Sequence, residues 1–197
     1  MKNTGKRCTG YIAGFLLLGT LLLVAVPLAL DHIKEWARRT ACNGNLGNPL
    51  RLALEQYAYP SYTNYPATLI GLPEYDISAM CLVCPEVTKT YGYPWPSNAV
   101  PSVRDMDKVT DYIYVNISGL SSSNSLAVPI VICPPINHHG KGGNVLFTDW
   151  QWSKWIPSPE IDRLIDWTYA YAESNGLRIV VSEALTKRSN GRYKSYP

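Results

Sequence analysis

The chain has 197 residues, enough for one folded domain with an appendage and too few for a large multidomain enzyme. Its 18 basic and 15 acidic side chains leave a net charge of +3, and no run of like charges adds to this surplus, which argues against nucleic acid as a partner. Apolar residues make up 46% of the chain, a content typical of folded proteins and not of disordered ones.

A segment without a charge covers residues 11–30, and about 20 such residues suffice for a helix to cross the hydrocarbon layer of a membrane. We therefore predict a cytoplasmic leader over 1–10, a transmembrane helix over 11–30 and export of the rest of the chain. The basic residues on the two sides are equal in number, so this orientation depends on the short basic leader that precedes the apolar run. The alternative is a cleaved secretory signal, although its apolar core is normally shorter, at about 7–15 residues.

Helical composition continues over 31–59, with a predicted break near 43–48, where Asn and Gly accumulate ahead of Pro49. Beyond the break, Leu50, Ala53, Leu54 and Tyr57 have the spacing of one buried helix face. Residues 60–110 are rich in proline and predict loops over a core.

Several short segments further along are typical of an antiparallel sheet. Strands are predicted at 111–115, 126–133, 144–148, 151–156 and 177–181, with the third and fourth forming a hairpin. A helix is predicted to start at 158–160 and to end at Gly176, and the basic tail 187–197 is expected to be flexible. The fold class is therefore α+β, with an exported domain over 60–186.

The cysteines allow three interpretations. The chain contains Cys8, Cys42, Cys81, Cys84 and Cys133. A thioredoxin-like redox site would use the C-x-x-C pair Cys81 and Cys84, and a zinc site would need a second ligand pair such as His138 and His139. A structural disulfide would join this region to Cys42 or Cys133, and the four exported cysteines allow three pairings.

One stretch carries a family resemblance. From His139 to Asp149 the chain reads HGKGGNVLFTD, with nine residues between the histidine and the aspartate, and a Trp-rich segment follows. This resembles the bacterial H-X9-DG domain of type IV pilin-like and type II secretion pseudopilin-like proteins. Weaker matches, in the family's order, are CNGNL from Cys42 to Leu46, the Tyr-Pro pair at 65–66, Cys84 with Pro85, and the strand at 112–115.

The resemblance implies a pilin-like fold, in which a long N-terminal helix packs on an antiparallel sheet, with an additional C-terminal helix in this chain. The motif residues are then His139, Gly142, Gly143, Asn144 and Asp149. A disulfide is expected between the matching cysteines, Cys42 and Cys84. The prepilin-peptidase site corresponds to Gly14 and Phe15, although Gly19 stands where the family has a glutamate.

Three site hypotheses remain open at this stage. His139 and Asp149 could form a catalytic base and its orienting carboxylate, although the sequence marks no nucleophile. By resemblance Asp149 is also a calcium ligand candidate, although one carboxylate is a small part of the six to eight oxygens that calcium prefers. The tryptophans at 150, 152 and 155 could bind glycans or a partner, or could pack on the sheet.

We therefore expect a single-pass protein of the inner (cytoplasmic) membrane that has its N-terminus inside and acts by assembly or protein contact. It would not be an enzyme, and it would need no cofactor other than calcium by resemblance. The expected partners are the membrane, further copies of the chain, other pseudopilins or secretion-system proteins. The competing classes are a membrane-anchored enzyme or thiol oxidoreductase and a glycan- or partner-binding module.

Overall fold

The structure is a computed structural model, and it describes residues 4–59, 65–69, 72, 78–91, 106–118, 127–149 and 153–197. The chain divides into two compact units, Met1–Arg38 and Arg39–Pro197. Large parts of the predicted loop region 60–110 lie outside the described residues.

The described residues of the first unit belong to α1, a helix that runs over Thr4–Asn45. Its side chains from Leu17 onward are mainly exposed, and they include leucines with exposed fractions of 71% at Leu17 and 75% at Leu23. The most apolar 18-residue window of this helical region has a mean hydropathy of 1.7, and none of it is buried. The helix is therefore long and apolar enough to cross a membrane.

At the predicted break the chain stays helical. Leu46–Leu50 forms a π-helical segment, η1, and α2 continues over Arg51–Ala58. Pro49 lies inside η1 and has no backbone N–H to donate, a loss that a wider helical turn accommodates. Leu50, Ala53 and Leu54 are buried as their spacing predicts.

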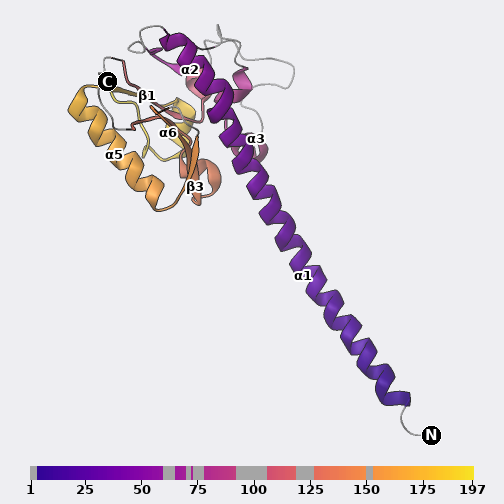
Figure 1. The fold of residues 1–197 in the computed structure, drawn as a ribbon. Coiled ribbons are helices and arrows are strands. Elements are labelled where there is room, and N and C mark those ends of the chain that lie inside the picture. Colours follow the sequence, from indigo (N-terminus) through magenta and orange to yellow (C-terminus); the bar gives the residue numbers. More distant parts are fainter. Residues whose placement is uncertain are drawn as a thin grey trace. The chain divides into compact units, whose positions relative to one another are not determined.

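The second unit contains a five-stranded sheet in the order β4-β3-β2-β1-β5. Figure 1 labels two of its strands, β1 and β3. The strands are β1 (Ile113–Asn116), β2 (Pro129–Ile132), β3 (Gly142–Phe147), β4 (Lys154–Pro157) and β5 (Arg178–Val180). All the pairs are antiparallel. The structure confirms the α+β class and the β3-β4 hairpin, whose turn at 150–152 lies outside the described residues.

Helices cover both faces of the sheet. Successive side chains of a strand point to opposite faces. A Cβ on Gly143 would meet Ile161 of α5 (Glu160–Asn175), whereas Asn144 donates from its side-chain amide to the Arg39 carbonyl of α1. The central strands are therefore buried on both sides, which explains why β1 and β2 lack the alternating burial of a half-exposed strand.

The additional C-terminal helix is confirmed as α5, which ends at Gly176 in the left-handed conformation (φ 63°). A further helix, α6, runs over Glu183–Arg188. The prediction of a flexible tail over 187–197 is wrong, because Tyr196 pairs with Ile179 of β5 through two backbone hydrogen bonds and Tyr193 is buried. Long-range contacts, which the composition of the tail does not encode, hold it in place.

Within the described parts of the chain, four short helices lie between the larger elements: η4 (Ala79–Leu82), α3 (Pro85–Tyr91), α4 (Met106–Val109) and η6 (Pro135–His138). Two of them, α3 and η6, border the candidate site.

Candidate functional site

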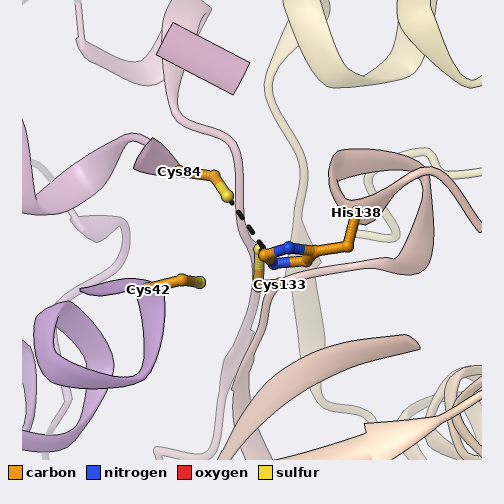
Figure 2. A group of neighbouring side chains, drawn as sticks. All are labelled: Cys42, Cys84, Cys133 and His138. Carbon is orange, nitrogen blue, oxygen red and sulfur yellow. Dashed lines mark hydrogen bonds between the residues drawn. The ribbon is translucent and has the colours of Figure 1, made fainter. Parts of the chain in front are cut away.

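Four side chains with metal-binding chemistry meet in the interior of the second unit. The thiols of Cys42, Cys84 and Cys133 and the imidazole of His138 place their ligand atoms within 4.8 Å of one another. All four are buried, the three cysteines with no exposed surface and the histidine with 4%. Figure 2 shows them pointing toward one another from different parts of the chain. Among the described residues this is the one such group of three or more His, Cys, Asp or Glu side chains.

Each member of this Cys3His cluster comes from a different segment. Cys42 lies near the end of α1, and Cys84 directly precedes α3, where its N–H donates to Asp111 Oδ2 at 2.8 Å. Cys133 follows β2, and its N–H donates to the Asn144 carbonyl at 2.8 Å. His138 is the last residue of η6.

The motif glycines bring the backbone close to the cluster. A Cβ on Gly143 would overlap the carbonyl oxygen of Cys133, so only glycine lets β3 approach the cysteine at this distance. Gly142 has φ of 147°, and a Cβ there would overlap the Ile156 carbonyl of β4. The motif glycines Gly142 and Gly143 therefore permit close packing of β3 on its neighbours.

The imidazole of His138 is held in a defined orientation. Its Nε2 lies 3.4 Å from Cys133 Sγ and 3.7 Å from Cys84 Sγ. Its ring meets that of Trp155 edge-on, with centroids 5.1 Å apart, and the Arg39 guanidinium lies 4.2 Å from the centroid of the Trp155 ring. The aromatic ring, with a cation over it, thus packs beside the cluster.

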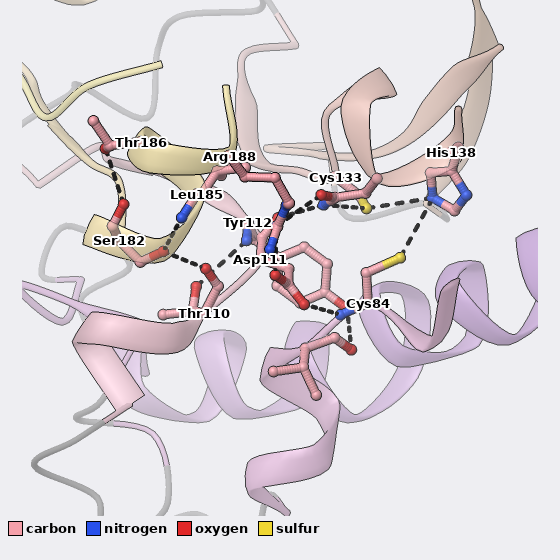
Figure 3. A network of polar contacts seen from close by, with 12 residues as sticks. Cys84, Thr110, Asp111, Tyr112, Cys133, His138, Ser182, Leu185, Thr186 and Arg188 are labelled. Atoms are coloured by element: carbon pink, nitrogen blue, oxygen red, sulfur yellow. Dashed lines mark hydrogen bonds and ion pairs between the residues drawn. The ribbon is translucent and has the colours of Figure 1, made fainter. Parts of the chain in front are cut away.

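A buried polar network contacts the cluster (Figure 3). The side-chain amide of Asn137 donates to Cys133 Sγ at 3.4 Å and to the Asp111 carbonyl at 2.7 Å. Arg188 of α6 donates to Asp111 Oδ1 at 2.6 Å and to Asn137 Oδ1 at 2.9 Å. The network therefore connects two cluster residues, Cys84 and Cys133, to α6.

Burial and mutual contact set the acidity of these groups. Burial raises the pKa of both Cys42 and Cys133 well above that of a free thiol, whereas contacts with the other two thiols lower the pKa of Cys84. Burial also raises the pKa of Asp111 to about 6, against the opposing effect of Arg188. Thiolates at this site would need a cation for compensation.

The structure does not contain the expected disulfide between Cys42 and Cys84. Both are free thiols and lie in one cluster with a third thiol and an imidazole. The C-x-x-C pair is also divided, because Cys81 is a half-buried residue of η4 outside the cluster, and burial raises its pKa. The zinc hypothesis from the sequence named two of the four cluster members, Cys84 and His138. Its other two residues, Cys81 and His139, lie outside the cluster.

The two neighbouring histidines point into different environments. His139 has a positive φ of 54°, and its Nε2 lies 3.0 Å from Glu86 Oε1, a buried carboxylate in the first turn of α3. Asp149 is exposed beyond the far end of β3, a strand about 17 Å long. His139 and Asp149 therefore do not form a catalytic pair.

The remaining predicted site residues add little chemistry. Asp149 belongs to no group of three or more metal-ligating side chains among the described residues, and its role as a calcium ligand stays a prediction. Trp150 and Trp152 lie outside the described residues, and Trp155 packs on His138. Gly14 and Phe15 lie within α1.

We compared the chain with protein-family models, with curated proteins and with solved structures, and none of the three comparisons gives a match.

Proposed function

We propose that this chain is a single-pass, pilin-like protein of the inner membrane that acts by assembly or protein contact. The observation that carries the proposal is the exposed apolar surface of α1, which includes Leu17, Leu21, Leu23 and Leu28. A helix that is apolar on all sides is typical of a membrane span, because exposure of such a large apolar surface to water is unfavourable. The α+β domain then lies outside the cytoplasm, with the N-terminus inside.

A contact function agrees with the chemistry of the domain. The Cys3His cluster is buried and gives a substrate no access, and His139 is paired with Glu86. The resemblance to pseudopilins favours further copies of the chain or secretion-system proteins as partners. With Gly19 in place of the family's glutamate, the membrane helix lacks the charge that would offset the N-terminal amine of a neighbouring subunit.

The experiment that tests this proposal is intact-mass analysis and N-terminal sequencing of protein extracted from native membranes. A chain that begins at Phe15 with a modified amine supports processing and assembly into a pilus-like filament. A chain that begins at Met1 or Lys2 supports a static anchor that acts by contact. A chain that begins near Asp31 and appears in the soluble fraction refutes the membrane proposal.

Chemical cross-linking in the same membranes identifies the contact. Cross-linked multiples of the chain mass support self-assembly, and a defined heteromeric product supports a secretion-system partner. A chain that stays monomeric at every cross-linker length contradicts the assembly function.

A thiol oxidoreductase is the second candidate, because Cys84 precedes α3 directly and contacts with the neighbouring thiols lower its pKa. The burial of Cys84 and the raised pKa of Cys81 oppose this role. Insulin reduction by the purified protein, abolished by Cys81→Ser, would support it.

A further inference from the structure

We propose that Cys42, Cys84, Cys133 and His138 bind one zinc ion as a closed, structural site. This inference goes beyond the proposed function and does not depend on the partner of the protein.

The distances match a tetrahedral site. Zinc bonds of about 2.3 Å to sulfur and about 2.05 Å to nitrogen give a tetrahedron with sulfur–sulfur edges of about 3.8 Å and sulfur–nitrogen edges of about 3.6 Å. The two distances from His138 Nε2 to sulfur are 3.4 and 3.7 Å, and every pair of ligand atoms lies within 4.8 Å. An ion at the centre requires only small side-chain movements.

The donors are those that zinc prefers. Three thiolates and one imidazole form a set that is common in structural zinc sites and soft enough to disfavour magnesium and calcium. Four protein ligands leave no open position for water or substrate, and all four residues are buried. The site would therefore stabilise the fold and would not catalyse a reaction.

Zinc explains the cluster better than a disulfide does. A disulfide would use two of the three sulfurs and would leave a thiol and an imidazole buried beside it, whereas zinc uses all four groups. On binding, the three thiols release their protons to solvent, and Zn²⁺ with three thiolates and a neutral imidazole has a net charge of −1. The Asn137 amide, 3.4 Å from Cys133 Sγ, is placed to donate to this anionic centre.

A bound ion would connect segments that are distant in the sequence. The ligands come from the end of α1, the start of α3, the end of β2 and η6. A single ion would thus fix the helix layer against the sheet.

The test is the zinc content of the full-length protein, purified in detergent without chelators. We expect about one zinc per chain, and a loss of about ten-fold or more after Cys84→Ser or His138→Gln. The controls are Cys81→Ser, the other cysteine of the C-x-x-C pair, and His139→Gln, the adjacent histidine, and both should retain the zinc. Equal zinc in the ligand variants and the controls would overturn the proposal, as would metal-free protein with a disulfide among Cys42, Cys84 and Cys133.

A second measurement on the unmutated chain covers the case in which the ligand variants do not fold. Replacement of zinc by Co²⁺ should give a thiolate-to-cobalt charge-transfer band and the strong visible absorption of tetrahedral cobalt. Weak absorption of the octahedral type, or no bound cobalt, would refute the site.

Discussion

Replacement of Arg188 by methionine tests the buried network behind the cluster. Arg188→Met removes the partner of Asp111, whose side chain is 3% exposed and lies 2.6 Å from the guanidinium. Two charges about 4 Å apart attract by about 4 kcal/mol at an effective dielectric constant of about 20. Breaking a buried pair from one side typically costs about 3–5 kcal/mol, because the remaining carboxyl must either stay charged in the interior or bind a proton.

The measurement is thermal unfolding of the full-length protein in detergent, followed by near-UV circular dichroism of its tyrosines and tryptophans. For a domain of this size, about 1 kcal/mol corresponds to about 2–4 °C, so Tm should fall by about 6–20 °C. The double variant Asp111→Asn/Arg188→Met removes both charges and keeps an acceptor for the Cys84 N–H, so it should recover all but about 1–2 kcal/mol.

Two results would refute this reasoning. One is a destabilisation of the single variant below about 1 kcal/mol, which would place the carboxylate in contact with solvent. The other is a double variant no more stable than Arg188→Met alone, which would assign the loss to packing of the arginine stem.

Four further predictions concern the core and the cluster. Gly143→Ala should destabilise the protein by about 1–3 kcal/mol, because the added methyl group would overlap the Cys133 carbonyl. The control Gly44→Ala lies in a helix with open space around it and should stabilise the protein by about 0.5–1 kcal/mol. Urea unfolding of both variants checks this. In the same assay, Leu54→Ala should lower the free energy of unfolding by about 2–5 kcal/mol, because Leu54 is buried. The control Leu52→Ala, at a side chain that is 41% exposed, should lower it by under about 1 kcal/mol. Zinc at a free concentration about 1,000 times its Kd should add about 4 kcal/mol to the free energy of unfolding, so a chelator should lower Tm by about 8–16 °C. An unchanged Tm would contradict a structural ion. Asn137→Ala should weaken zinc binding by about 10–100-fold in a competition titration, and an unchanged affinity would remove the amide from the ligand environment.

Much of the fold follows from local sequence signals. Helix α5 has an apolar stripe at helical spacing and a glycine at its end, and both features act within a few residues. The strands of the sheet have β-rich segments bounded by turns, and the hairpin joins neighbours in sequence. These signals locate elements without any knowledge of tertiary contacts.

The cluster could not be predicted in the same way, because its members approach one another only in the folded chain. Cys42 and Cys133 are separated by most of the domain, and no spacing rule relates them. The sequence did offer a signal in the three cysteines and the histidine pair, although only one of the two adjacent histidines, His138, belongs to the cluster. The left-handed backbone at His139 separates the two side chains, and local sequence does not reveal that conformation.

The π-helical segment η1 changes the direction in which successive side chains of the helix point. Buried residues recur every fourth position across it, at Cys42, Leu46, Leu50, Leu54 and Ala58. In a regular α-helix each such step rotates the side chain by about 40°, so the last of the five would point about 160° away from the first. A wider turn, with about 4.4 residues, absorbs much of this drift. One continuous side of the helix can therefore carry both the cysteine of the cluster and the leucines of the core. A one-residue deletion in η1 would turn these two groups away from each other, even though every side chain among them remained.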